Sequence, residues 1–256
     1  MTPPVSSTPA VRTDGLTKRY GDTTAVDGLD LSIPEGQVYG FLGPNGAGKT
    51  TTMRMLTTLS RPTAGTAHIM GTPVEDREAV VDHLGYLPEQ PPLYEELTGR
   101  EQLEYVAYLH DVPDDVATER IGRYLDRFGL ADAADDRIST YSKGMRQKAA
   151  LVQALLHEPA VLFLDEPTSG LDPRAARTVR DLVADLADRD IAIFLSTHIL
   201  SVVDELADVV GVLNRGTLVA EGDPEKLKRR AETGEERTLE EAFLEVTSEE
   251  PEATVD

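Results

Sequence analysis

Residues 43–50 read Gly43-Pro44-Asn45-Gly46-Ala47-Gly48-Lys49-Thr50, which fits the pattern G-x-x-x-x-G-K-T. In this pattern the glycines let backbone N–H groups converge on phosphates, Lys49 reaches the β- and γ-phosphates, and the Thr50 hydroxyl is a ligand of Mg²⁺. The apolar residues 37–42 predict a buried strand before the loop, and residues 50–58 predict a helix whose N-terminal dipole favours an anion. A glycine-rich turn can match the pattern by accident, but the strand–loop–helix context favours a phosphate-binding loop and a bound nucleoside triphosphate.

The composition limits the kinds of site and partner that we expect. The chain has 256 residues, no cysteine and a formal net charge of −21. That length can bury a substantial core, and the lack of cysteine excludes disulfides and thiolate metal sites. So much negative charge repels the nucleic acid backbone, so we expect no nucleic acid partner. It would also keep a protein soluble in concentrated salt, and we therefore expect a salt-adapted source.

The two ends and the apolar stretches bear on location. Residues 1–10 are rich in Pro, Ser and Thr and hold no apolar signal core, and we expect them to be disordered. The uncharged stretch 191–203 is too short to span a bilayer. We therefore expect a cytoplasmic protein. Residues 223–256 are charged, with an amphipathic stretch at 239–246, and predict an acidic extension with a short helix and a disordered tail.

Strand and helix patterns alternate around the phosphate loop. Residues 11–33 alternate in polarity and carry turn residues, which predicts a short antiparallel sheet. The apolar runs 160–164 and 191–196 are typical of central parallel strands. Residues 90–158 look almost wholly helical. We expect an α/β fold with a parallel core sheet, an N-terminal antiparallel β subdomain and an inserted helical lobe at about 90–158, within one domain spanning 11–222. The other expected elements are strands near 66–70 and 83–87 and helices at 98–109, 117–128, 142–157 and 173–187.

Two acids, Asp165 and Glu166, follow the apolar strand expected at residues 161–164. An acid at the C-terminal tip of such a strand faces the ligand crevice of an open α/β sheet. Asp165 would hold Mg²⁺, directly or through water, opposite Thr50, and Glu166 would orient or deprotonate an attacking water. A solvated strand end is the alternative, but it does not explain why the acids accompany a phosphate loop.

A short polar segment opens the helix expected at 142–157. It reads Tyr141-Ser142-Lys143-Gly144-Met145. Ser142 is a good N-cap, and a helix N-terminus with a serine and a close-approach glycine also binds phosphate. Both roles can hold at once.

Together and in this order, the motifs resemble those of the nucleotide-binding subunit of an ABC transporter, over about residues 11–222. The resemblance implies a P-loop NTPase fold of the ABC-ATPase type. It makes residues 43–50 the Walker A loop, with Thr51 beside it, and residues 162–165 the Walker B strand, followed by the catalytic acid Glu166. It implies ATP and Mg²⁺ as the cofactors.

The same resemblance assigns roles outside the two Walker motifs. Tyr20 would stack on adenine, although an ordinary sheet aromatic is the alternative. Ser142 and Gly144 would belong to the signature motif, which touches the γ-phosphate held by another copy. Residues 169–172 match the D-loop, in which Asp172 is also a good N-cap before Pro173. His198 matches the switch histidine that contacts the γ-phosphate.

The sequence departs from the usual family pattern at two places. The signature normally reads L-S-G-G-Q, whereas here it reads Tyr-Ser-Lys-Gly-Met over residues 141–145. The Q-loop glutamine is expected after Pro88, where the chain has Glu89 followed by Gln90, and either residue could approach Mg²⁺. Both departures, and residues 239–244, resemble the exporter branch called ABC type 2.

The resemblance also implies partners and a place of action. It implies a head-to-tail dimer enclosing two ATP molecules, and an integral membrane permease that the dimer drives. The protein is then expected to be peripheral, at the inner face of the cell membrane. A soluble ABC ATPase acting in iron–sulfur cluster assembly, on nucleic acid or on the ribosome is the alternative. The negative charge and the exporter-like signature argue against it.

Overall fold

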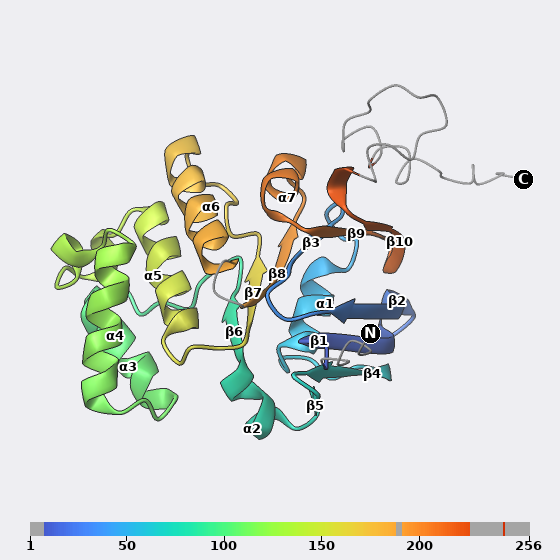
Figure 1. Ribbon diagram of the computed structural model, residues 1–256, viewed down its shortest axis with the longest axis horizontal. Coiled ribbons are helices and arrows are strands. Elements are labelled where there is room, and N and C mark those ends of the chain that lie inside the picture. The colour runs from blue at the N-terminus through green and yellow to red at the C-terminus, as the bar shows by residue number, and fades with distance from the viewer. Residues whose placement is uncertain (1–7, 188–190, 226–242, 244–256) are drawn as a thin grey trace, which may run out of the picture.

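The computed structural model describes residues 8–187, 191–225 and 243. Its strands form two sheets (Figure 1). The smaller sheet has the order β2-β1-β4-β5 and is antiparallel throughout. Its strands are β1 (Val11–Tyr20), β2 (Thr23–Ile33), β4 (Ala64–Ile69) and β5 (Thr72–Pro73). The antiparallel sheet expected at 11–33 is confirmed, and β4, which follows the phosphate loop in sequence, extends it.

The larger sheet has the order β10-β9-β3-β8-β7-β6. Its strands are β3 (Val38–Leu42), β6 (Leu84–Leu87), β7 (Val161–Asp165), β8 (Ala192–Thr197), β9 (Val209–Asn214) and β10 (Thr217–Gly222). Five strands run parallel, and β10 pairs antiparallel with β9. Every residue of β3, β7 and β8 is buried, as expected for central strands covered on both faces.

The helices cover the two faces of the larger sheet. They are α1 (Lys49–Leu56), α2 (Arg77–Val80), α3 (Gly99–Leu109), α4 (Asp114–Arg127), α5 (Lys143–Leu155), α6 (Pro173–Ala187) and α7 (Leu200–Leu206). Within the described residues, 3₁₀ turns lie at Val81–His83, Ala131–Ala133 and Ile138–Thr140. Figure 1 shows α1 between the larger sheet and the antiparallel sheet, with α3, α4 and α5 gathered at the opposite end of the molecule.

Polar caps define where several of these helices begin. Thr98 and Glu101 form a reciprocal capping box at the start of α3. The Ser142 hydroxyl accepts a hydrogen bond from Met145 N at the start of α5, and Asp172 accepts from the N–H groups of two residues at the start of α6. The N-cap roles expected for Ser142 and Asp172 are therefore confirmed.

The core lies on both faces of the larger sheet because side chains alternate along its strands. Phe41, Phe163 and Phe194 point to the face covered by α1 and the antiparallel sheet, and they belong to one buried cluster. Leu162 and Leu164 of β7 point to the other face, in a cluster with residues of α3, α4, α5 and α6. Because β3, β7 and β8 are parallel neighbours, their carboxyl ends meet at one edge of the sheet. The stretch 239–246, expected to be helical, lies outside the described residues except for residue 243.

Candidate functional site

The loop between β3 and α1 forms an open cradle of backbone N–H groups. The left-handed Gly48, with φ of 110°, is the N-cap of α1 and provides no capping side chain, so the first N–H groups of the helix stay available. A Cβ at Gly48 would collide with the carbonyl oxygen of Ala25, so the loop can pack on β2 only through a glycine. Gly46 also has a positive φ, 83°, and the space that a Cβ would occupy at this position is open. This geometry fits a phosphate group at the start of α1.

Lys49 lies inside this loop as a buried cation. Its side chain is 7% exposed, and Nζ donates to the carbonyl oxygens of Gly43 (2.8 Å) and Pro44 (3.3 Å). Nζ also lies 3.6 Å from Oε1 of Glu166. The structure therefore brings together Lys49 and Glu166, which lie 117 positions apart in the sequence.

Glu166 is held by the neighbouring strand. It follows β7 with φ of 50°, in the left-handed region, and its backbone N–H donates to the carbonyl oxygen of Ser196 at 2.9 Å. Oε1 lies 2.9 Å from His198 Nδ1, and Oε2 accepts from the Thr197 hydroxyl at 3.1 Å. The backbone strain fits a residue whose position is set by function, since its surroundings must stabilise that conformation.

Asp165 lies deeper, at the last position of β7. It is 1% exposed and its Oδ1 accepts from the hydroxyls of Ser196 (2.5 Å) and Thr50 (3.5 Å). Burial raises the pKa of Asp165, and the hydrogen bonds from Ser196 and Thr50 oppose this shift. The carboxylate of Asp165 and the hydroxyl of Thr50, both expected to serve Mg²⁺, therefore lie side by side.

These oxygens suit a hard cation that also takes ligands from a phosphate chain. In the described part of the chain no group of three or more His, Cys, Asp or Glu side chains could hold a metal ion alone. Mg²⁺ commonly uses one or two protein oxygens together with phosphate oxygens and water. Thr50 and Asp165 fit that requirement.

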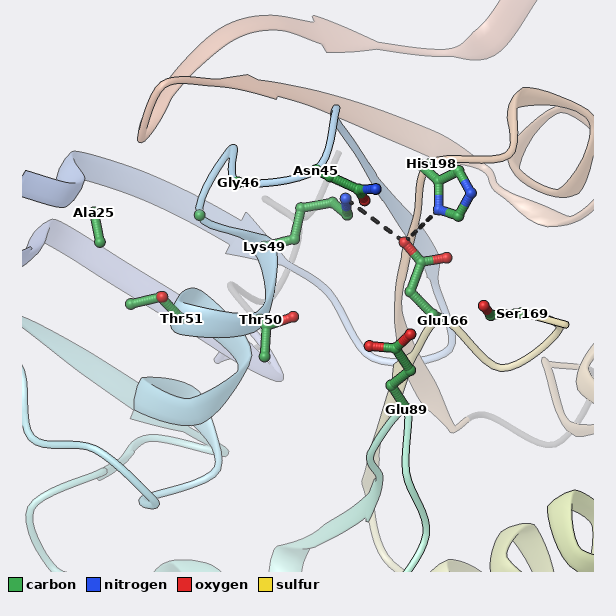
Figure 2. A pocket seen from close by; sticks show the side chains of 11 residues that line it. Ala25, Asn45, Gly46, Lys49, Thr50, Thr51, Glu89, Glu166, Ser169 and His198 are labelled. Atoms are coloured by element: carbon green, nitrogen blue, oxygen red, sulfur yellow. Dashed lines mark hydrogen bonds and ion pairs between the residues drawn. The ribbon is translucent and has the colours of Figure 1, made fainter.

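A cavity of about 310 Å³ opens beside these groups. Figure 2 shows Lys49 and His198 converging on Glu166, with Glu89 facing the same space. The lining residues come from β2, the loop, α1 and the segments after β6, β7 and β8. They are Ala25, Asn45, Gly46, Gly48, Lys49, Thr50, Thr51, Glu89, Glu166, Ser169 and His198.

Several expected site residues lie elsewhere. Of the two Q-loop candidates, Glu89 lines the cavity, whereas Gln90 is exposed and is not among its lining residues. Tyr20, at the end of β1, is 50% exposed and also outside the lining, and Lys18 Nζ lies 5.0 Å from its ring centroid. The adenine contact of Tyr20 stays a prediction.

The signature residues are separated from the cavity of their own chain. Ser142 and Gly144 lie at the start of α5, where a Cβ on Gly144 would come within 3.1 Å of the Ala175 side chain on α6. Neither residue is among those lining the cavity. Ser142 is exposed and therefore accessible to another molecule.

Sequence reasoning placed Ser169 in the D-loop, but it did not assign Ala25, Ser196 or Thr197 to the site. The two hydroxyl residues stand directly before His198 at the end of an apolar strand, which is a signal that the sequence contained. Ala25 gave no signal, because its place depends on how β2 packs against the loop.

The comparison with known protein families decides the relationship. Residues 26–169 match the family model described as ABC transporter. The chain belongs to the ABC transporter family. This confirms the resemblance drawn from the motifs, and the relatives and the fold agree with it.

Two relatives and one solved structure illustrate this ABC transporter family membership. The chain is 45% identical over 229 residues to the daunorubicin resistance ATP-binding protein DrrA3 of Streptomyces coeruleorubidus, covering 89% of this chain and 72% of the relative. It is 40% identical over 222 residues to the bacitracin transport ATP-binding protein BcrA of Bacillus licheniformis, covering 86% and 72%. A solved ATP-binding subunit of an ABC transporter superposes with a TM-score of 0.84 at 29% identity, covering 93% of this chain and 99% of that one. The expected ABC-ATPase fold is thereby confirmed.

The helices bear on whether this part of the chain could itself cross a bilayer. In residues 8–187, 191–225 and 243, none has the length and apolar character needed to cross a membrane.

Proposed function

We propose that this ABC transporter protein binds ATP with Mg²⁺ in the cavity, hydrolyses it and thereby drives export through a separate membrane permease. The observation that carries the proposal is the place of the Glu166 carboxylate, 3.6 Å from Lys49 Nζ and 2.9 Å from His198 Nδ1 at the edge of the phosphate loop. An acid in that position is within reach of a water molecule that attacks a phosphate bound by the loop.

Each residue then has a defined task. The loop N–H groups and Lys49 bind the phosphates, and Thr50 and Asp165 would hold Mg²⁺, which supplies positive charge to the phosphate oxygens. Glu166 takes a proton from the attacking water. His198, whose side chain is 45% exposed at the cavity, donates a hydrogen bond to the terminal phosphate. Glu89, which lines the cavity from the segment after β6, would approach Mg²⁺.

A second copy of the chain completes the site in this proposal. Ser142 lies at the start of α5, outside the cavity of its own chain, and it is exposed. A head-to-tail dimer brings Ser142 and Gly144 of one copy to the terminal phosphate in the other. ATP then adds contacts that exist only in the closed dimer, so it shifts the population towards closure, and hydrolysis reverses the shift.

The proposed membrane partner docks beside α3. Four large apolar side chains are exposed there within 16 positions, at Tyr94, Tyr105, Tyr108 and Leu109. Tyr94 and Tyr105 pack edge to face, with ring centroids 5.7 Å apart. Exposed aromatic residues of this kind favour a protein interface. Because Tyr94 follows the cavity residue Glu89 by five positions, the same segment would pass motion to a permease and keep the protein at the inner face of the membrane.

The names of the relatives support export over the other functions considered. One is named for daunorubicin resistance and the other for bacitracin transport, and the Tyr-Ser-Lys-Gly-Met segment of this chain resembles the exporter-like form of the signature. No observation favours iron–sulfur cluster assembly or action on nucleic acid or the ribosome. The net charge of −21 opposes a nucleic acid partner.

The enzymatic part of the proposal is tested by phosphate release from ATP with Mg²⁺. Glu166→Gln keeps the shape of the side chain but removes its basicity, so turnover should fall by about a hundredfold or more. The matched control is Glu119→Gln on the exposed face of α4, which should retain the wild-type rate. Equal turnover in the two variants would disprove the role of Glu166.

A further inference from the structure

Two hydroxyl side chains at the end of β8 lie beside the two acids at the end of β7. The strands are parallel and Asp165 pairs in register with Ser196, so the next residues, Glu166 and Thr197, also come side by side. The Ser196 hydroxyl donates to Asp165, and the Thr197 hydroxyl donates to Glu166. Each acid therefore has one hydroxyl partner on the neighbouring strand.

The hydrogen bond from Thr197 has a fixed direction. Thr197 Oγ1 accepts from the backbone N–H of Ile199 at 3.1 Å, and an N–H can only donate. The single hydroxyl hydrogen is thus left for Oε2 of Glu166, 3.1 Å away. Thr197 is 0% exposed, so water does not compete for this bond.

The two oxygens of Glu166 consequently have different surroundings. Oε2 is anchored to the buried Thr197, whereas Oε1 faces Lys49 and the partly exposed His198 on the cavity side. A carboxylate whose one oxygen is anchored cannot rotate freely about its terminal bond. The other oxygen is then held towards the position of the attacking water.

We infer that Thr197 is a positioning residue that fixes the Glu166 carboxylate with Oε1 facing the reacting phosphate. This inference rests on the proposed role of Glu166 as the acceptor of the water proton. Thr197 touches neither ATP nor water in this account. Its effect on turnover passes wholly through Glu166.

The test compares Thr197→Val, which is nearly the same shape without the hydroxyl, with Thr197→Ser, which keeps it. For Thr197→Val we expect kcat to fall about ten- to a hundredfold, the range for one hydrogen bond to a charged group, with KM for ATP changed less than about twofold. Thr197→Ser should restore most of kcat. The matched control is Thr57→Val: Thr57 is also buried, at 4% exposed, but its hydroxyl donates to Met53 O at the end of α1. It should leave kcat unchanged.

A double-mutant cycle separates positioning from general loosening of the site. Once Glu166→Gln has removed the base, adding Thr197→Val should lower the residual turnover no further, because the two residues act as one unit. If Thr197→Val fails to fold, judged by its thermal transition, the same fall in kcat is expected for Thr197→Ala, whose side chain is smaller.

The outcomes also distinguish this inference from the proposed function. Undiminished turnover in Glu166→Gln would disprove the proposed function itself. Diminished turnover in Glu166→Gln, together with wild-type kcat in Thr197→Val, would overturn the inference alone. If Thr197→Val lowers turnover by the same factor in the Glu166→Gln background as in the wild type, the inference is overturned as well.

Discussion

Lys49 Nζ lies 3.6 Å from Glu166 Oε1, and both side chains are less than 10% exposed. The cation of the phosphate loop and the acid at the end of β7 thus form a buried ion pair at the edge of the cavity. Removing one partner of a buried pair leaves an uncompensated charge, so each residue depends on the other or on a ligand of matching charge. Phosphate binding at Lys49 is therefore coupled electrostatically to Glu166.

Lys49→Ala should therefore abolish productive binding of ATP. The phosphates lose a charge-assisted donor, and the uncompensated Glu166 carboxylate repels them, so we expect turnover to fall at least about a hundredfold. Titration calorimetry with ATP and a phosphate-release assay measure the two effects. The control is Lys148→Ala, farther along α5, which removes the same charge outside the cavity. Unchanged ATP affinity in Lys49→Ala would contradict the assignment of the loop.

Asp165 should set the need for Mg²⁺. Asp165→Asn can still accept a hydrogen bond from Ser196, but it loses the charge that attracts the metal, so half-maximal turnover should require at least about tenfold more Mg²⁺. Chelation of Mg²⁺ with EDTA should stop wild-type turnover. Asp181→Asn, on the exposed side of α6, is the control and should keep the wild-type Mg²⁺ dependence. The same Mg²⁺ dependence in Asp165→Asn would argue against the metal role.

The stacked pair His110 and His157 should make stability depend on pH. Their rings are parallel, with centroids 4.0 Å apart, and His157 Nε2 lies 2.9 Å from Leu84 O. Burial, followed by the neighbouring His110, lowers the pKa of His157 to about 4. A histidine in the unfolded chain has a pKa of about 6.5. Between pH 4 and pH ~6.5, the unfolded chain therefore binds a proton at His157 that the folded chain does not. Stability contributed by neutral His157 is present above pH ~6.5 and is lost as the pH falls towards 4.

This pH dependence can be measured by urea unfolding between pH 4 and 7. His157→Phe keeps an aromatic ring in the stack but removes this titration, so its stability should fall less steeply with decreasing pH than that of the wild type. His68→Phe, on β4 in the other sheet, serves as the matched variant. If the free energy of unfolding falls equally steeply with decreasing pH in His157→Phe and in the wild type, His157 does not contribute to the pH dependence.

The aromatic cluster under α1 should dominate the stability of the core. Phe194 is 1% exposed, and its ring centroid lies 5.1 Å from that of Phe41 and 5.7 Å from that of Phe163. Phe194→Ala should lower the free energy of unfolding by about 3–5 kcal/mol because it opens a cavity in the core. Tyr108→Ala, at a side chain 76% exposed, should change it by less than about 0.5 kcal/mol. Similar losses in both variants would contradict this description of the core.

The sequence predicted the parts of the fold and site that depend on local patterns. The phosphate loop, the apolar run ending in Asp165 and Glu166, and the caps at Ser142 and Asp172 each lie within a few consecutive residues. A local pattern of this kind determines a local conformation, which explains why these predictions agree with the structure.

The remaining features depend on how distant segments come together. Thr197 reaches Glu166 only because β7 and β8 pair in one particular register. Glu89 faces the cavity and Gln90 does not, which depends on the direction of the chain after β6. Neither relationship leaves a periodic trace in the sequence, and both follow from the arrangement of the strands.

The most direct test of the central claim is the oligomeric state of the Glu166→Gln variant in solution with ATP. Each chain has a mass of 27.9 kDa. Size-exclusion chromatography with light scattering should show a monomer without nucleotide and a particle of twice that mass with ATP, because binding continues while hydrolysis is blocked. Adding Ser142→Ala should weaken the ATP-dependent dimer, since that serine completes the partner's site. A Glu166→Gln protein that stays monomeric at saturating ATP would contradict the account.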